Sequence, residues 1–190
     1  MPADAEVFRS PALTELNRIL ENELNDFARK QSDDFEELCE RYSTEHKVEI
    51  TPIYFDLVNK DEILSAIKLI RKSKKAINGL INNAGVNKIQ TIDKISEDEW
   101  DWINNVNLKG PFLLTRKISR IMKKNHSGKI VNISSIFSTI SKAKRASYSA
   151  TKWGLIGLTK AIALDLAPHN ILVNAVSPGF VDTELTRKIL

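Results

Sequence analysis

The chain has 190 residues, of which 42% are hydrophobic and 27% are charged, with a formal net charge of +4, which is typical of one soluble globular domain and excludes a disordered tail. Its single cysteine, Cys39, excludes an internal disulfide and a cysteine-based metal site, so we expect no metal and a reducing, cytoplasmic location. No stretch approaches the roughly 20 apolar residues of a membrane span, so we expect no membrane partner. The basic clusters lack the interleaved aromatics of a nucleic-acid module, so we expect no nucleic-acid partner.

The first predicted element is an N-terminal helix. Charged residues alternate with apolar ones that recur at helical spacing, namely Leu13, Leu16, Ile19, Leu20, Leu24 and Phe27. We therefore separate residues 1–27, an amphipathic helical segment, from a partial α/β domain over residues 28–190. This helix would cover an exposed sheet surface, dimerise, or pack on its own core.

Four apolar runs then predict buried strands, at residues 48–55, 79–82, 129–134 and 171–176. Helical patterns separate the runs. One helix begins after Asn59 and reaches about residue 74, and a second begins after Ser96; an acid three residues further on gives each start capping-box spacing. Gly110-Pro111 should kink the second helix. Alternating strands and helices predict a parallel α/β sheet.

Two residues near the start of the next predicted helix indicate acid–base chemistry. Tyr148 and Lys152 are four residues apart, so both side chains project from one helix face. An unperturbed tyrosine holds its proton up to about pH 10, and a nearby cation stabilises the phenolate and lowers the tyrosine pKa. Tyr148 is therefore a candidate for proton exchange near neutral pH.

A serine closes the third predicted strand. Ser135 would lie at the C-terminal end of that strand, where open α/β sheets bind ligands. Ser134 is the alternative, because adjacent strand residues point to opposite faces of the sheet. Both could also be ordinary hydroxyls at a strand end.

Five segments together resemble the short-chain dehydrogenase/reductase family, and in particular its 3-oxoacyl-carrier-protein reductase-like members. They occur in the order and spacing of the family from about residue 28 to the C-terminus, and the spacing from serine to tyrosine favours Ser135. A Tyr-x-x-x-Lys pattern alone is unspecific, whereas five ordered segments are specific. The segments are Ile81-Asn-Asn-Ala-Gly85, Asn105-Val-Asn107-Leu, Val131-Asn-Ile-Ser-Ser135, Tyr148-Ser-Ala-Thr-Lys152 and Ser177-Pro-Gly-Phe-Val-Asp-Thr183.

The resemblance implies an NAD(P)-dependent oxidoreductase with a doubly wound, Rossmann-like sheet that interconverts a carbonyl and an alcohol. Tyr148 would be the general acid/base, and Ser135 would hold the substrate oxygen. Lys152 would bind the nicotinamide ribose and lower the Tyr148 pKa. Asn107 would anchor a water that relays protons to Lys152, unless it is simply a helix residue bonded to backbone.

Further residues match cofactor-binding positions of the family. Gly85 would let the backbone approach the cofactor closely. Asp56 matches the acid that contacts the adenine, or else is a turn residue. Arg29 slightly favours NADP, because an arginine there commonly meets the 2′-phosphate, or else is a solvated cation at a helix end. The remaining positions are Asn83, Ala84, Pro178, Gly179, Val181 and Thr183.

The chain departs from the family in its first third. The family has a glycine-rich turn after its first strand, but the first of the seven glycines here is Gly79, so no pyrophosphate-cradling loop can be drawn upstream. The recognisable strands match strands 3 to 6 of the order 3-2-1-4-5-6. We therefore expect an incomplete fold without its first strands and its last strand, whose apolar edges invite pairing with another chain.

Such a chain would be a truncated or alternatively spliced product, an incomplete gene model, or a chain completed by a partner. A second function therefore stands beside the enzymatic one. In this alternative, the chain is a catalytically incompetent relative that acts, if at all, through association with other chains.

The family also implies partners. The substrate would be a small carbonyl or alcohol. Lys142, Lys144 and Arg145 lie between Ser135 and Tyr148, in a stretch that borders the substrate in this family. They form either a solvated loop or a group that attracts an anionic substrate, such as a carrier-bound thioester or a sugar nucleotide. The helices that carry Asn107 and Tyr148 often form a dimer face in the family, so we expect a homo-oligomer.

Overall fold

The computed structural model describes residues 31–73 and 75–181, which belong to two compact units. Of the first unit it describes residues 31–54 and 180–181, and of the second residues 55–179 without residue 74. The helix predicted over residues 1–27, and the domain boundary that follows it, lie outside the described residues and stay predictions.

The described part of the first unit contains one helix, α2 (Gln31–His46). It buries Leu38, Cys39 and Tyr42, which recur at helical spacing. At its C-terminal end the Tyr42 ring stacks on the His46 ring, with 5.5 Å between ring centroids.

Residues 48–55 do not form a strand, so this prediction was wrong. The segment is irregular, and no described strand of the sheet pairs with it. A strand needs a neighbour to complete its backbone hydrogen bonds, and apolar side chains alone do not supply one. Within the segment Phe55 is buried, whereas Tyr54 is exposed.

The second unit is built on a three-stranded parallel sheet in the order β1-β2-β3, which confirms the predicted parallel α/β fold. The strands are β1 (Gly79–Asn82), β2 (Gly128–Ile133) and β3 (Ile171–Val176). They coincide within one residue with three predicted apolar runs. Leu80, Ile130 and Val173 are register partners and all buried, so a row of core side chains crosses the sheet.

A buried polar chain lies two residues further along the strands. Asn82 and Asn132 are register partners, and Asn82 Nδ2 donates to Asn132 Oδ1 at 2.7 Å. Asn132 Nδ2 in turn donates to Thr159 Oγ1 at 2.9 Å, and Asn82 Nδ2 also donates to Thr115 Oγ1 at 3.2 Å. The two asparagines therefore join the sheet to the two helices that carry these threonines.

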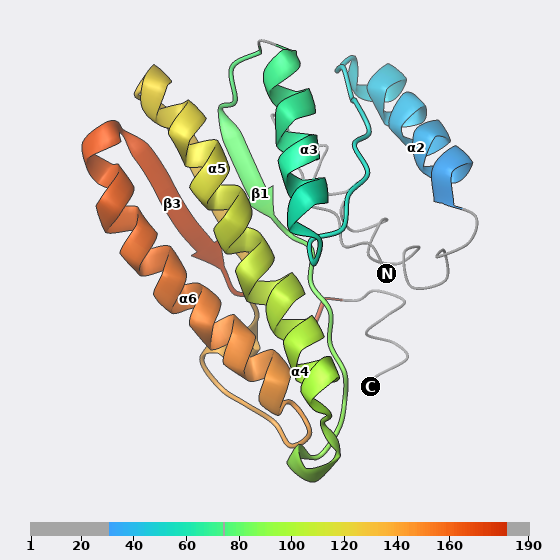
Figure 1. Ribbon diagram of the computed structural model, residues 1–190, viewed down its shortest axis with the longest axis vertical. Helices are drawn as coiled ribbons and strands as arrows, with labels where there is room; N and C mark the ends of the chain where they lie inside the picture. Colours follow the sequence, from blue (N-terminus) through green and yellow to red (C-terminus); the bar gives the residue numbers. More distant parts are fainter. Residues whose placement is uncertain (1–30, 74, 182–190) are drawn as a thin grey trace. The chain divides into compact units, whose positions relative to one another are not determined.

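Helices α3, α5 and α6 lie side by side on one face of the sheet (Figure 1). Their bounds are α3 (Lys60–Lys72), α4 (Glu97–Asn104), α5 (Gly110–Asn125) and α6 (Ala146–Leu166), with short turns η1 (Ile92–Lys94), η3 (Ile136–Ser138) and η4 (Ala167–His169). Gly128 allows α5 to approach β2 closely, because a β-carbon there would lie 2.4 Å from Met122 Sδ.

The helix starts follow the predicted capping residues. Ser96 caps α4 in a full capping box, in which Glu99 N–H donates to the Ser96 hydroxyl and Glu99 accepts from Ser96 N–H. Asn59 caps α3, but its capping box is not completed. Glu62, the acid three residues further on, accepts from Asn59 Nδ2 and from Asp56 N–H. The backbone N–H of Asn59 already donates to the Asp56 carbonyl, so Glu62 binds other donors.

The kink expected at Gly110-Pro111 takes the form of a π-helical turn, η2 (Asn105–Lys109), between α4 and α5. Gly110 N–H donates to the Asn105 carbonyl, five residues back. Pro111 has no N–H and would clash with a carbonyl of the preceding turn, and the wider turn relieves this conflict without breaking the helix. The turn contains Asn107, which is buried.

Candidate active site

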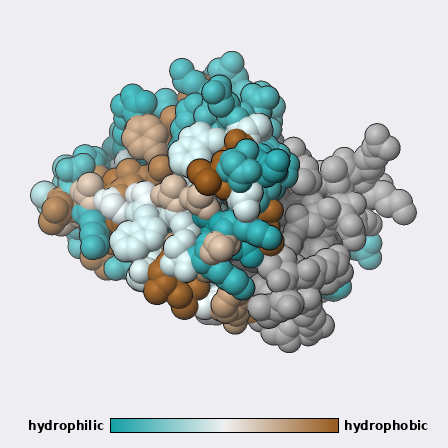
Figure 2. Space-filling model, turned by 90° about the horizontal axis from the view of Figure 1, so that it is seen from below, coloured by the Kyte–Doolittle hydropathy of each residue, from teal (hydrophilic) through white to brown (hydrophobic). Residues whose placement is uncertain are grey.

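The four residues predicted for catalysis meet at the carboxyl edge of the sheet in the second unit. Ser135 follows β2, Asn107 lies in η2, and Tyr148 and Lys152 lie in the first two turns of α6. Figure 2 views the molecule from this end, where apolar and polar surface alternate. The loops that follow β1 and β2 expose Ile89, Ile92 and Ile140.

Lys152 is the centre of this arrangement. It is 3% exposed, its Nζ donates to the Ile133 carbonyl at 2.8 Å, and this ammonium lies 5.5 Å from the centroid of the Tyr148 ring. Tyr148 is half-buried, and its ring packs edge-to-face against Phe137 at a centroid distance of 6.2 Å. The four-residue spacing thus places the phenol and the ammonium together.

Asn107 connects three segments. Its Oδ1 accepts from Val86 N–H at 2.8 Å, and its Nδ2 donates to the Val86 carbonyl at 2.8 Å and to Thr151 Oγ1 at 3.1 Å. Thr151 Oγ1 donates to the Tyr148 carbonyl at 2.8 Å. The Asn107 side chain therefore holds the loop after β1 against the first turns of α6.

Gly85 contacts the same group of side chains. A β-carbon at this position would lie 3.3 Å from Lys152 Nζ and 3.5 Å from Asn107 Oδ1. The sequence assigned Gly85 to close approach of a cofactor. The structure adds that Gly85 also leaves room for the Lys152 ammonium.

Ser134 and Ser135 have different partners. Ser134 Oγ donates to the Lys152 carbonyl at 3.0 Å, so its hydroxyl proton is already bound to the backbone of α6. Ser135 Oγ accepts from Phe137 N–H at 3.2 Å. An oxygen that accepts in this way keeps its own proton for another acceptor. This difference favours Ser135 as the group that contacts a ligand.

Of the three basic residues between Ser135 and Tyr148, Lys142 and Lys144 are exposed, whereas Arg145 is 6% exposed. The Arg145 guanidinium lies 5.9 Å from the centroid of the Phe137 ring. Burial lowers the pKa of Arg145, and the charge of the Tyr148 phenolate opposes this shift. The sequence did not distinguish Arg145 from the two lysines, because burial is not a property of charge pattern.

Comparison with known proteins identifies the family. The pattern that defines the short chain dehydrogenases matches residues 18–190. This chain belongs to that family. The family resemblance stated from the five sequence segments is thereby confirmed, and so is the Rossmann-like fold class.

Two curated short-chain dehydrogenases illustrate the likeness. The 3-oxoacyl-(acyl-carrier-protein) reductase FabG of Aquifex aeolicus (strain VF5) is 40% identical over 152 residues, which are 80% of this chain and 59% of that protein. The cyclopentanol dehydrogenase of Comamonas sp. (strain NCIMB 9872) is 38% identical over 138 residues, 73% of this chain and 55% of that protein. The chain thus spans less than two thirds of the length of these relatives.

A solved structure is similar as well. The gluconate 5-dehydrogenase from Burkholderia cenocepacia J2315, in complex with NADP and tartrate, matches with a TM-score of 0.75 at 32% identity. The match covers 80% of this chain and 59% of that one.

The structure describes some of the other residues predicted to bind the cofactor. Asn83 and Ala84 directly follow β1, beside Gly85. Pro178 and Gly179 follow β3, and the Pro178 carbonyl accepts from Ile136 N–H at 2.8 Å, which ties this segment to η3. Val181 is exposed and belongs to the first unit. Arg29 and Thr183 lie outside the described residues.

Asp56 lies in the turn before α3. Its Oδ1 accepts from Val58 N–H at 2.8 Å, and its carbonyl accepts from Asn59 N–H at 3.1 Å. These bonds match the turn role that the sequence left open for Asp56. They leave its contact with an adenine a prediction.

Thr151 and Ser138 are supporting residues that sequence reasoning missed. Both are buried, and Ser138 Oγ lies 3.0 Å from Ser177 Oγ and donates to the Ser135 carbonyl at 2.6 Å. Thr151 lies inside the Tyr-Ser-Ala-Thr-Lys segment, one turn after Tyr148, so its spacing was a usable signal. Ser138 gave none, because its side-chain partner Ser177 is 39 residues away.

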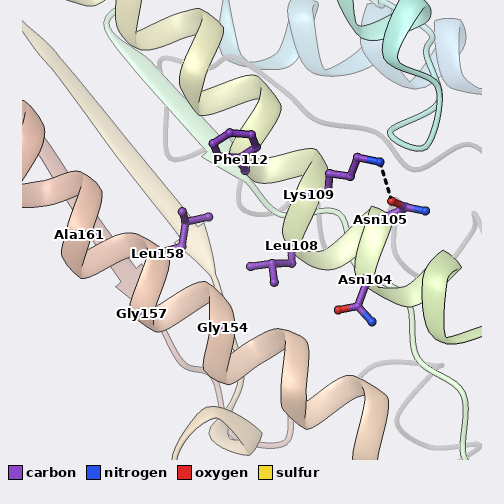
Figure 3. A pocket seen from close by; sticks show the side chains of 9 residues that line it. All are labelled: Asn104, Asn105, Leu108, Lys109, Phe112, Gly154, Gly157, Leu158 and Ala161. Carbon is purple, nitrogen blue, oxygen red and sulfur yellow. Dashed lines mark hydrogen bonds between the residues drawn. The ribbon is translucent and has the colours of Figure 1, made fainter.

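A groove of about 560 Å³ lies elsewhere on the second unit, between η2, α5 and α6 (Figure 3). Leu108 points toward α6, where a β-carbon added to Gly154 would lie 3.0 Å from Leu108 Cδ2. At its rim Lys109 Nζ donates to Asn105 Oδ1 at 3.1 Å. The other lining residues are Asn104, Phe112, Gly157, Leu158 and Ala161.

Among the described residues, no group of three or more His, Cys, Asp or Glu side chains is placed to hold a metal ion. No helix there is both long and apolar enough to cross a membrane.

Proposed function

We propose that this protein is an NAD(P)-dependent oxidoreductase that interconverts a carbonyl and an alcohol, with Tyr148 as the general acid/base. The observation that carries the proposal is the buried Lys152 ammonium, 5.5 Å from the Tyr148 ring centroid. A cation at this distance stabilises the phenolate and favours proton exchange by the phenol.

Each remaining catalytic residue has a role that suits its partners. Ser135 donates its hydroxyl proton to the substrate oxygen, because its own oxygen already accepts from Phe137 N–H. Asn107 fixes the spacing between the loop after β1 and α6 through Val86 and Thr151. This keeps Lys152 and Tyr148 in place, and we assign the proton-relay water to the neighbourhood of Asn107.

The residues present fit the nicotinamide end of a dinucleotide. Lys152 is at hand for the ribose, and Gly85 keeps the loop after β1 free of a side chain beside it. The cofactor supplies or accepts the hydride. We assign its binding to Arg29, Asp56, Asn83, Ala84, Gly85, Tyr148, Lys152, Pro178, Gly179, Val181 and Thr183. Arg29, and the NADP named for the gluconate 5-dehydrogenase, slightly favour NADP.

We further propose a small anionic substrate, cytoplasmic location and a homo-oligomer. Among the substrates named for similar proteins, gluconate carries a carboxylate, whereas cyclopentanol is neutral. The single cysteine of the chain fits a reducing compartment. The groove between α5 and α6 exposes apolar Phe112 to a second copy.

The test is Tyr148→Phe, which removes one oxygen. NADPH oxidation is followed with a panel of ketones and oxoacids, and nucleotide binding by fluorescence titration. Turnover should fall by a factor of about 10²–10⁴, the usual contribution of a general acid or base, while the nucleotide affinity stays within about twofold of wild type.

Tyr54→Phe is the matched control, because Tyr54 is exposed and belongs to the first unit. It should leave both measurements unchanged. Retained turnover in Tyr148→Phe would remove Tyr148 from its role. If the folded wild-type protein neither binds nucleotide nor reduces any carbonyl, the alternative of a catalytically incompetent relative that acts through association takes its place.

A further inference from the structure

The Arg145 side chain is buried and has no hydrogen-bond acceptor among the described residues. It is 6% exposed, and its Nη1 atom is enclosed. A guanidinium carries five N–H donors, yet no described residue accepts from Arg145 and no described carboxylate forms an ion pair with it. Burying a charge without compensation is costly, so a buried cation of this kind indicates a missing anion.

The neighbours of Arg145 compensate its charge only in part. The guanidinium faces the Phe137 ring at 5.9 Å, and the Phe137 ring packs on the Tyr148 ring. A cation–π contact is weaker than a paired carboxylate. Phe137 therefore positions the guanidinium beside Tyr148 without neutralising it.

The start of α6 is a second, independent feature at the same place. Arg145 is the N-cap of this 21-residue helix, no side chain caps it, and no acidic residue lies in its first turn. The N-terminus of a helix attracts anions through its N–H groups and its dipole. Two groups that favour negative charge thus belong to adjacent residues, and the first turn of α6 holds no acidic side chain.

The loop backbone fixes this position. Lys144 has a left-handed backbone, with φ of 66°, and its carbonyl accepts from Gln90 N–H at 3.3 Å. This bond joins the loop after β1 to the loop after β2, immediately before Arg145. The guanidinium is therefore held on a fixed turn beside the acid–base residue.

We propose that Arg145 and the first turn of α6 bind an oxyanion, either a carboxylate or a phosphate ester, that the substrate carries within a few bonds of its reacting carbonyl. The inference rests on the proposed function, and it assigns the anion preference to Arg145 and not to Lys142 or Lys144. Those lysines are exposed and belong to a solvated loop.

The geometry limits the size of the substrate. Arg145 and Tyr148 both pack on the Phe137 ring, so the oxyanion lies close to Tyr148. A planar guanidinium binds carboxylate and phosphate oxygens in pairs. The small exposed fraction of Arg145 admits a compact group, and this favours short oxoacids or sugar phosphates as substrates.

The test compares charged ligands with neutral partners of similar size. Calorimetric titrations in buffer with NADP⁺ use 4-oxopentanoate against 4-oxopentanamide, and dihydroxyacetone phosphate against dihydroxyacetone. In the wild type the charged member of at least one pair should bind about tenfold tighter or more, and in Arg145→Gln this ratio should fall to about one. The pair that responds shows whether a carboxylate or a phosphate is bound.

Two variants control the result. Lys142→Gln removes a nearby exposed cation and should keep the wild-type ratio, whereas Arg145→Lys keeps the charge without the planar fork and should give an intermediate ratio. The melting temperature of ligand-free Arg145→Gln should equal or exceed that of the wild type, because the variant no longer buries an unpaired charge. A structural arginine would give the opposite result.

The proposal is overturned if neither charged ligand binds better than its neutral partner, or if the preference survives in Arg145→Gln. Its failure is distinct from failure of the proposed function. Tyr148→Phe should lose turnover and keep the Arg145-dependent preference. A wild type that shows this preference but reduces no carbonyl would refute the oxidoreductase and leave the oxyanion site standing.

Discussion

At Thr151 a single hydroxyl joins the helix that carries Tyr148 to the π-helical turn that carries Asn107. It donates to the Tyr148 carbonyl and accepts from Asn107 Nδ2. Both Asn107 N–H groups and its carbonyl oxygen are thereby paired in a fully buried position. Pairing of this kind matters because a buried donor without an acceptor is costly.

Thr151→Val keeps the shape of the side chain and removes this acceptor. We expect the free energy of unfolding to fall by about 1–3 kcal/mol, because a buried amide N–H of Asn107 loses its partner. Urea denaturation followed by circular dichroism measures the change. Thr139→Val is the control, since its hydroxyl binds only the Ile136 carbonyl at an exposed position. Equal effects of the two substitutions would contradict this role.

Among the elements, the start of α4 agrees in detail with its sequence pattern. The Ser96 capping box is formed as its spacing predicted, and Glu99 also forms an ion pair with Lys88 in the loop after β1. The capping residue thus fixes α4, and through Glu99 it holds the loop that leads to Asn107.

Ser96→Ala should lower the free energy of unfolding by about 0.5–2 kcal/mol, the usual cost of losing a side-chain cap. Thr91→Ala is a matched control, because Thr91 stands at the N-cap of η1 without a side-chain hydrogen bond. Thermal and urea unfolding measure both. An equally large loss in Thr91→Ala would show that the effect of Ser96→Ala does not come from capping.

The sequence was informative where a pattern depends on neighbours in the chain. Apolar runs located β1, β2 and β3, and the spacing of Tyr148 and Lys152 placed phenol and ammonium together. Residues 48–55 were misread because a strand depends on a partner that periodicity does not describe. The Gly110-Pro111 pair predicted a kink but not its π-helical form. The burial of Arg145 arises from packing between distant segments, so no local pattern could reveal it.

On the scale of the whole molecule, the groove between η2, α5 and α6 is the surface that bears on assembly. Gly157 lies in it, is exposed, and has open space around the position of a β-carbon. A side chain added there therefore points outward without disturbing the fold. This makes Gly157 a suitable probe of the proposed homo-oligomer.

Gly157→Glu should shift the protein toward monomer by placing a charge in the contact between copies, while its folding is preserved or slightly improved, since glycine costs a helix interior about 0.5–1 kcal/mol. Gly157→Ala is the control and should retain the oligomer. Sedimentation velocity measures the mass of each. A wild type that is monomeric, or an oligomer that persists in Gly157→Glu, would exclude this face as the interface.

The hydrogen-bonded asparagines of β1 and β2 also affect strand pairing during folding. Asn82 Nδ2 donates to Asn132 Oδ1 only when β1 and β2 align as observed. A slip of one residue would set each amide against an aliphatic neighbour and turn it to the opposite face. The buried amides therefore penalise misaligned pairings of β1 and β2 during folding. Valine and isoleucine side chains alone would favour the correct alignment less strongly, because neighbouring aliphatic residues are similar to one another.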